Sequence, residues 1–306
     1  MDKAKGDPFM KRIKKVVLLV AAVLFVCGAA CGILGWRMAG GDWRALYPFQ
    51  TEPVTQPVAA CRSITVDCLD VDVQIRPTEG ETGSVSFESQ TGVVCTEEDG
   101  VLTVRQERRT AWQFGWFHWS EKVEILVPAA TYEQLTVQTT SGNVTVAGLD
   151  VTRAEIAVSS GNVQYTGGNA ASLQIESTSG NIRLKGLRDI EQMRLQATSG
   201  DITAQDCTGD ALEAAAFSGD IRLQESAWSG EARLTTTSGD VELPDFDAGA
   251  LTVQTTSGDV TGILRTPKIF DSHTGSGRIE VPLSGSGGLC RVETGSGDIR
   301  LTLKNQ

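Results

Sequence analysis

The chain has 306 residues and a formal net charge of −11 at pH 7. Its first 36 residues hold six of the 27 basic and two of the 38 acidic residues, so the remaining 21 basic and 36 acidic residues give a charge of about −15. An acidic surface argues against nucleic acid as a partner and against broad adsorption to anionic lipid, because both ligands are polyanionic.

One apolar stretch stands out near the N-terminus. Residues 16–35 are apolar or small and uncharged, and this run is long enough to span a bilayer as a helix. Six basic residues precede it and aromatic residues follow it. By the positive-inside rule, we expect residues 1–15 to be a cytoplasmic basic tail, residues 16–36 to cross the lipid bilayer as a transmembrane signal anchor, and the rest to lie outside. A cleaved signal peptide is the alternative, although its apolar region is usually shorter.

Two segments connect this stretch to the C-terminal half. Residues 37–60 contain Pro48, Pro53 and Pro57 and predict an extended spacer. Residues 61–132 contain strand-like runs separated by turn sequences: ITVDC, VDVQI, SVSFES, GVLTVRQE and KVEILVP. Because these runs do not recur at a fixed period, we expect a β-rich cap module that covers the open edge of the domain after it.

A repeat occupies the C-terminal half. Nine Ser-Gly pairs recur at steps of 19 or 20 residues, and their serines are Ser141, Ser160, Ser179, Ser199, Ser218, Ser238, Ser257, Ser276 and Ser296. The residue after the pair is Asn or Asp in eight copies and Arg278 in the other, and Val or Ile comes next in all nine. A period of about twenty residues predicts a solenoid whose stacked coils bury one continuous core.

Each repeat contains two short strands joined at a corner. With the Ser as position zero, apolar or small residues occupy positions −6, −4 and −2 and resume at +3 and +5, as at Leu135, Val137 and Val144. A spacing of two is strand periodicity, and its change of parity at Ser-Gly-Asn/Asp indicates a turn. We therefore predict an all-β fold: a parallel β-solenoid of about nine 19–20-residue coils over residues 133–306, with an N-terminal β-rich cap over residues 61–132, preceded by one transmembrane helix.

The C-terminal end of this solenoid lacks an obvious cap, because the chain stops soon after the strand at residues 301–303. An unpaired edge favours pairing with another chain, so the sequence allows self-association through the C-terminal solenoid edge.

Five cysteines follow the apolar stretch. Cys207 and Cys290 occupy core positions of their repeats. For Cys61, Cys68 and Cys95 we favour isolated buried thiols, and a disulfide among them is the alternative.

At this point the residues carry a family likeness. The basic N-terminus, the single apolar span, a β-rich module ending in ILVPAATYEQLTV and serial TSGN or TSGD corners followed by Val or Ile resemble the bacterial "putative adhesin" family of β-strand-repeat envelope proteins. The likeness covers roughly residues 61–306. It implies a surface-exposed, non-enzymatic β-solenoid. Together with the positive-inside pattern, we expect a single-pass protein of the bacterial cell membrane, with its N-terminus cytoplasmic and its C-terminal domain extracytoplasmic. The resemblance brings no catalytic residues.

Enzyme chemistry finds little support in the sequence. The two histidines, His118 and His273, lie far apart and outside any nucleophile or zinc motif, and no phosphate-binding or dinucleotide fingerprint occurs. We therefore expect a protein that is not an enzyme and has no cofactor.

The corner acids are a weak candidate for a metal site. Asp201, Asp220, Asp240 and Asp259 recur in consecutive repeats, where carboxylates about 4.8 Å apart repel one another. Calcium would relieve that repulsion, since it takes six to eight oxygen ligands. The simpler interpretation, which we favour because each coil supplies one acid, is that each Asp closes its own turn and faces solvent.

An aromatic cluster is the best candidate for a binding site. Three of the six tryptophans lie within eight residues, together with two phenylalanines, and the cluster comprises Trp112, Phe114, Trp116, Phe117 and Trp119. At an exposed hairpin tip these side chains would bind a glycan, a protein or the membrane interface. In the interpretation that we favour, they seal the cap on the first coil instead.

These features together favour an adhesin-like surface binding module whose ligand is an unknown surface glycan or protein. The alternative is an envelope-stress sensor or regulatory scaffold that works through a membrane partner, because the tail at residues 1–15 is too short to signal by itself.

Overall fold

The computed structural model describes residues 8–38, 53–88, 91–107, 121–283 and 285–304. The chain divides into two compact units, Met1–Thr51 and Glu52–Gln306.

The first unit contains one helix, α1 (Pro8–Met38), which includes four of the six basic residues that precede the apolar stretch as well as Arg37 in its last turn. Across the described part of the chain, no helix combines the length and the apolar character that crossing a membrane requires. The transmembrane helix that the sequence predicts for residues 16–36 is therefore not found.

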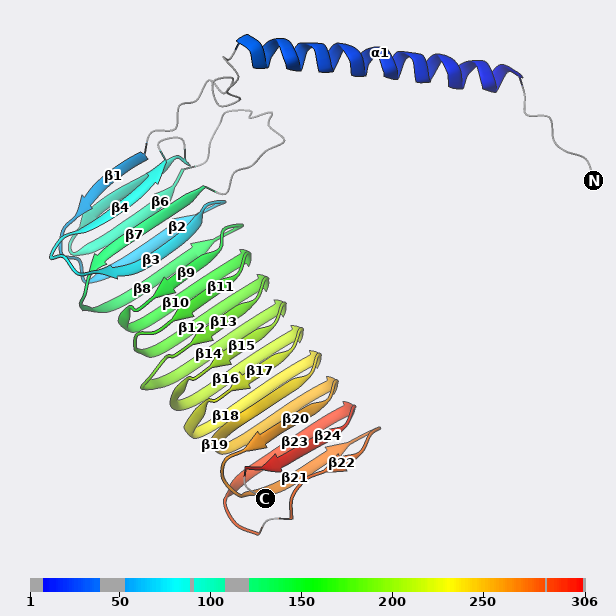
Figure 1. Ribbon diagram of the computed structural model, residues 1–306. Coiled ribbons are helices and arrows are strands. Elements are labelled where there is room, and N and C mark those ends of the chain that lie inside the picture. The colour runs from blue at the N-terminus through cyan, green and yellow to red at the C-terminus, as the bar shows by residue number, and fades with distance from the viewer. Residues whose placement is uncertain (1–7, 39–52, 89–90, 108–120, 284, 305–306) are drawn as a thin grey trace, which may run out of the picture. The chain divides into compact units, whose positions relative to one another are not determined.

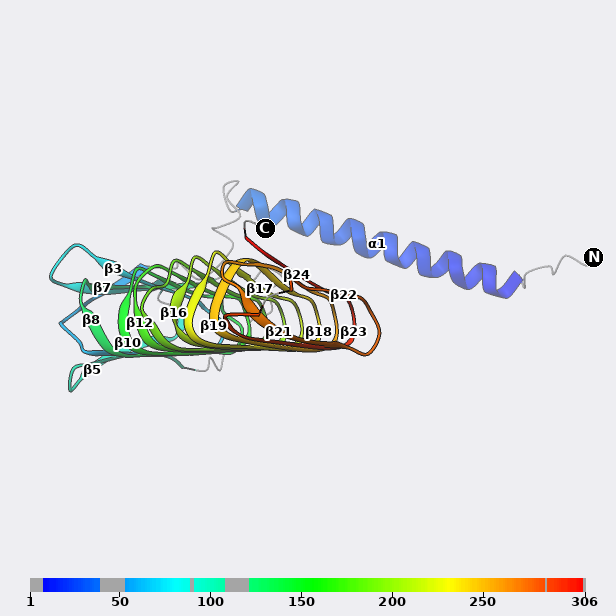
Figure 2. The ribbon, with the colours of Figure 1, turned by 90° about the horizontal axis from the view of Figure 1, so that it is seen from below.

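The second unit is an all-β parallel solenoid of two facing sheets, as Figure 1 shows along the stack and Figure 2 shows with the two layers edge on. The longer strands form sheet B, in which β8 (Thr131–Thr139), β10 (Asp150–Ser160), β12 (Ala170–Ser179), β14 (Ile190–Ser199), β16 (Thr208–Ser218), β18 (Ala227–Ser238) and β19 (Val241–Ser257) pair in parallel.

The shorter strands form sheet A on the other side of the core. They follow the Ser-Gly corners and also pair in parallel: β9 (Val144–Ala147), β11 (Val163–Thr166), β13 (Ile182–Lys185), β15 (Ile202–Gln205), β17 (Ile221–Gln224), the first part of β19, and β20 (Val260–Leu264). One coil is therefore one strand of each sheet with a corner between them.

The core lies between the two sheets and follows the predicted alternation. Leu135 and Val137 before the first corner and Val144 and Val146 after it are fully buried, and equivalent positions are buried in the following coils. Burying several such side chains per coil supplies the driving force, at about 25 cal/mol per Å² of apolar surface removed from water. The predicted inward positions are confirmed.

Glycine at each corner is required by the close approach of the coils. A Cβ atom built on Gly180 would lie 2.0 Å from the carbonyl oxygen of Gly161, and one on Gly161 would lie 2.2 Å from that of Gly142. Because the coils stack with Ser160, Ser179 and Ser199 in register, the same contact recurs from one coil to the next.

The last two coils are not stacked in sequence order. The strand β23 (Gly288–Ser296) pairs with β19 on one side and with β21 (Lys268–Thr274) on the other. Likewise β24 (Ile299–Leu303) lies between β20 and β22 (Ile279–Glu280). The C-terminal coil is therefore inserted inside the stack, and the outermost coil consists of β21 and β22 (Figure 1).

The composition of the two coils explains this order. The inserted coil buries five apolar side chains, Cys290, Val292, Ile299, Leu301 and Leu303. In the outermost coil, position −4 holds Ser272, whose hydroxyl has no hydrogen-bond partner among the described residues, and Ile279 at +3 is 43% exposed. The coil that buries fewer apolar side chains is therefore the outermost one.

The described solenoid makes about eight full turns after the cap, where the nine Ser-Gly pairs predicted about nine. The exposed edge is β21–β22 and not the predicted strand at residues 301–303.

A similar insertion occurs at the N-terminal end. The strands β2 (Ser63–Cys68) and β3 (Asp72–Thr78) pair in parallel with β8 and β9 on one side, and with β6 (Val101–Gln106) and β7 (Lys122–Pro128) on the other. Part of the predicted non-repetitive cap therefore continues the parallel stack.

Antiparallel strands then end the stack. The strand β5 (Val93–Glu98) pairs with β6 in sheet B, while β4 (Gly83–Glu88) pairs with β7 in sheet A and with β1 (Pro53–Val58). These strands cover the edge of the first coils, as the sequence predicts for the cap.

Replacing a corner glycine tests the close stacking. Gly180→Ala forces Cβ against the backbone of Gly161, so we expect it to lower the free energy of unfolding by about 1–3 kcal/mol, measured by urea denaturation. Gly80→Ala is the control, because the nearest atom to its Cβ lies 3.7 Å away. Equal stability of the two variants would contradict the contact.

Cysteine pairs test the order of the last coils. Gln254 faces Glu293 in the neighbouring strand, whereas His273 lies one strand farther away. Because adjacent strands are about 4.8 Å apart and a disulfide spans Cα atoms about 4.4–6.8 Å apart, Q254C with E293C should oxidise to a disulfide, and Q254C with H273C should not. Peptide mapping under non-reducing conditions measures both. The opposite result would mean that the coils stack in sequence order.

Candidate functional site

A ladder of Asn and Asp side chains runs along the Ser-Gly corners. Except at Arg278, the Oδ1 atom of the residue after each corner Gly accepts a hydrogen bond from the backbone N–H of the equivalent residue in the next coil, and Asp72, which follows Val71, does the same for Asn143. Across the described residues, nine such bonds of 2.8–3.1 Å connect, in spatial order, Asp72, Asn143, Asn162, Asn181, Asp201, Asp220, Asp240, Asp259, Asp298 and Arg278.

The ladder explains why Asn and Asp alternate freely at this position, since both side chains present the Oδ1 acceptor that the bond needs. The sequence predicted that each acid closes its own turn, whereas the structure shows it completing the corner of the next coil. Arg278 ends the ladder because its coil is the outermost one among the described residues. Its backbone N–H is also the main reason why the pKa of Asp298 is lowered from its ordinary value.

The calcium candidate is not tested by these contacts. Asp201, Asp220 and Asp240 each use Oδ1 to bind the next coil. Among the described residues, no three His, Cys, Asp or Glu side chains form a cluster that could hold a metal ion. The ladder therefore has a structural role of its own, and calcium binding stays a prediction.

The aromatic candidate site lies outside the described residues. The cluster comprises Trp112, Phe114, Trp116, Phe117 and Trp119, and all five fall within residues 108–120, between the described ranges 91–107 and 121–283. The structure therefore neither places these side chains together nor separates them.

Six cysteines are free thiols: Cys27, Cys61, Cys68, Cys95, Cys207 and Cys290. Cys207 and Cys290 are fully buried at the predicted core positions. Burial raises the pKa of Cys68 and of Cys290 to about 12, and that of Cys95 to about 11. Such thiols stay protonated near neutral pH, so they are poor nucleophiles and poor metal ligands.

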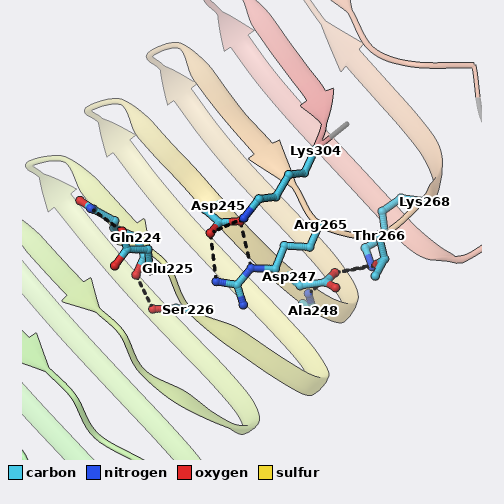
Figure 3. Close-up of polar contacts among 10 residues, drawn as sticks. All are labelled: Gln224, Glu225, Ser226, Asp245, Asp247, Ala248, Arg265, Thr266, Lys268 and Lys304. Carbon is cyan, nitrogen blue, oxygen red and sulfur yellow. Dashed lines mark hydrogen bonds and ion pairs between the residues drawn. The ribbon is translucent and has the colours of Figure 1, made fainter. Parts of the chain in front are cut away.

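Two polar clusters fasten the C-terminal coils to the stack (Figure 3). Asp245 accepts hydrogen bonds from Arg265 at 3.0 Å and from Lys304 at 2.9 Å, and these bonds, that of Arg265 first, lower its pKa. Asp247 accepts from Lys268 at 2.7 Å. Because Lys304 follows the inserted strand β24, its bond holds the end of that strand against β19.

A hollow of about 850 Å³ lies beside the second cluster. Its lining includes the buried Trp228, the Asp247–Lys268 pair and the acidic rim residues Asp189 and Asp210. The Lys268 ammonium is almost completely buried and already bonds Asp247 and Thr266 (Figure 3). We interpret this cluster as the contact that holds the outermost coil on the stack, since Lys268 is the first residue of β21 in that coil.

The second hollow is an open groove of about 640 Å³ on the outer face of sheet B, and it is the candidate functional site. It crosses seven consecutive strands, from β2 through β8, β10, β12, β14 and β16 to β18. We call it the sheet-B groove, and it is lined mainly by positions −3, −2 and −1: Asp67, Cys68, Gln138, Thr139, Thr140, Ala157, Val158, Ser159, Glu176, Ser177, Thr178, Gln196, Ala197, Thr198, Ala215, Ala216, Phe217, Thr235 and Thr237.

Parallel stacking turns positions −3 and −1 into rows of side chains along the groove. Five of the seven lining strands contribute a hydroxyl group at −1, β16 contributes Phe217, which is 61% exposed, and β2 contributes no residue at this position. In spatial order the row at −3 contains Asp67, Gln138, Ala157, Glu176, Gln196, Ala215 and Thr235, so that two small alanines interrupt the polar side chains. Such a surface offers hydrogen-bond donors and acceptors at a regular spacing and one aromatic face.

Sequence reasoning missed this groove. It treated the outward positions of each repeat one coil at a time. The available signal was the recurrence of Ser or Thr directly before the first seven Ser-Gly pairs, interrupted by Phe217; the last two pairs follow Gly275 and Gly295.

Comparisons with known proteins agree with this architecture. The chain matches the family model described as Toastrack DUF4097 over residues 61–302, and no curated protein matches it. A solved structure described as a putative adhesin from Parabacteroides distasonis is similar, with a TM-score of 0.54 and 14% identity over 83% of this chain and 98% of that chain.

Two further solved structures are less similar. One is described as a putative adhesin from Parabacteroides merdae, with a TM-score of 0.42 and 12% identity over 83% of this chain and 97% of that one. The other is a putative lipid binding protein from Parabacteroides distasonis, with a TM-score of 0.40 and 16% identity over the same shares. At 14% identity, the likeness to the first of these structures concerns the fold alone.

The ladder makes a testable prediction at Asp220. Asp220→Ala leaves the backbone N–H of Asp240 without its acceptor, so we expect the free energy of unfolding to fall by about 1 kcal/mol. Asp220→Asn keeps Oδ1 and should unfold like the parent chain in urea. A loss of the same size in both variants would show that the carboxylate charge matters and the hydrogen bond does not.

Proposed function

The chain belongs to the Toastrack DUF4097 family, and on that premise we propose that its solenoid is a non-enzymatic, adhesin-like module that binds ligands at the cell surface. The likeness to adhesin-type β-solenoids that the sequence predicts is confirmed for family and fold. The name of the similar putative adhesin from Parabacteroides distasonis supports the adhesin-like role.

One observation carries the proposal: the sheet-B groove extends across seven strands of one continuous stack. An open groove of repeated side chains suits an extended ligand and does not enclose a small substrate as an active-site pocket does. The buried, protonated thiols and the ladder carboxylates, which already bond the backbone, leave little reactive chemistry along the stack.

The proposed location rests on the sequence. The run of basic residues before the apolar residues 16–35 follows the positive-inside pattern, which places the following residues outside the cytoplasm. We accordingly propose that residues 61–306 face the exterior of a bacterial cell.

Adhesion of intact cells tests the function. Cells that produce the chain should adhere to a glycan- or protein-coated surface more than cells without it, and protease added to the intact cells should remove both residues 61–306 and the adhesion. Ile221→Asp should abolish adhesion, because a buried unpaired charge costs several kcal/mol and unfolds the solenoid.

Arg222→Ala is the matched control, since its side chain is exposed on the neighbouring position of the same strand. Full protection of residues 61–306 from protease would contradict the location. If cross-linking in cells recovers one recurrent membrane protein and no surface ligand, the regulatory scaffold replaces the adhesin.

A further inference from the structure

We propose that the sheet-B groove binds an extended, uncharged polysaccharide. This inference rests on the proposed surface-binding function and names the ligand class of its groove. Adjacent strands lie about 4.8 Å apart, so the six intervals between the seven strands give the groove a length of roughly 29 Å. A ligand that fills it is a polymer and not a single sugar.

The hydrogen-bonding groups of the groove match sugar hydroxyls. An amide both donates and accepts, as a sugar hydroxyl does. Among the described residues, the side-chain amides of Gln138 and Gln196 make no hydrogen bond within the protein, and both belong to the groove lining. The hydroxyls of Thr140, Thr178 and Thr198 repeat along the same side at the spacing of the strands.

The aromatic side chain provides the apolar part of the site. Phe217 is 61% exposed and lies in the groove beside the small Ala215 of its own strand. A single exposed apolar residue is ordinary on a protein surface, but this one interrupts a row of hydroxyls within a polar groove. The C–H face of a sugar ring packs against the negative face of an aromatic ring, so Phe217 suits a pyranose.

The charges of the groove argue for an uncharged polymer. Its lining contains two carboxylates and no Lys or Arg. Asp67 Oδ2 lies 3.6 Å from Arg105 Nε, and Glu176 accepts a hydrogen bond from Gln174 at 2.8 Å. Both carboxylates therefore already have a partner within the protein and do not require a cationic ligand. A polyanion meets no basic residue in the lining and is repelled by the net charge of −11.

The direction of the groove argues against a peptide. Extended peptides usually gain affinity by pairing their backbone with a free strand edge. The sheet-B groove runs across strands whose backbone groups are already paired with their neighbours from β2 to β18. It therefore presents side chains alone, which is what a polysaccharide uses.

Calorimetric titration of the purified full chain tests the proposal. The probes are chito-oligosaccharides and cello-oligosaccharides of increasing length, with heparin as the polyanion. We expect affinity to rise with oligosaccharide length, no binding of heparin, and a loss of roughly tenfold in Phe217→Ala, the size of one good aromatic contact. Gln196→Ala should also weaken binding.

The control is Ile263→Ala, because Ile263 is a comparably exposed apolar residue, at 44%, on strand β20 of sheet A and outside the groove. It should bind like the parent chain, and circular dichroism should show all three variants folded. Equal binding by Phe217→Ala and the parent chain, binding of heparin alone, or binding of neither oligosaccharide series would overturn the proposal.

The two proposals fail separately. If cells that carry the chain adhere while no oligosaccharide binds, the polysaccharide assignment is wrong and the adhesin-like function stands. If oligosaccharides bind through Phe217 while the cells do not adhere, the groove assignment stands and the adhesin-like function is wrong.

Discussion

In-register stacking of coils about 4.8 Å apart is the constraint on which the rest of the structure depends. It brings the backbone of each corner so close to the preceding one that glycine is needed, as the contact between Gly180 and Gly161 shows. It also leaves an N–H at each corner that only the neighbouring coil can satisfy, which Asn143 and Asp220 do through Oδ1. Contact between neighbouring coils, more than the turn within one coil, therefore requires the Ser-Gly-Asn/Asp motif.

The same constraint decides which coil stands at the end. A terminal coil has a neighbour on one side only, so its inward side chains are partly exposed and its ladder acceptor has nothing to bind. The coil with Ser272 inside and Arg278 at the corner tolerates both conditions. The chain reaches that arrangement by returning to insert β23 and β24, and Lys304 then bonds Asp245 to secure the inserted strand.

Stacking also creates the candidate site from residues that are unremarkable one at a time. Gln138, Gln196 and Phe217 are far apart in sequence, and each is an ordinary outward residue of its strand. Parallel register aligns them into rows, and the rows form a groove longer than any one coil. A ligand that binds along such rows has repeating chemical units of its own. The repeating architecture of the solenoid therefore suits recognition of a polymer.

The sequence by itself determined the solenoid, its period and the inward positions such as Leu135 and Val144, because strand alternation and turn chemistry are local properties that recur in every repeat. Only the tertiary structure decided the order of the terminal coils, the partner of each ladder side chain and the sheet-B groove. These features depend on which coils become neighbours. The order of the coils is in turn determined by the apolar surface that the whole stack buries and by the hydrogen bonds that it forms. The exception at Arg278 was visible in the sequence, but its cause is tertiary: in the described part of the chain its coil is the outermost one.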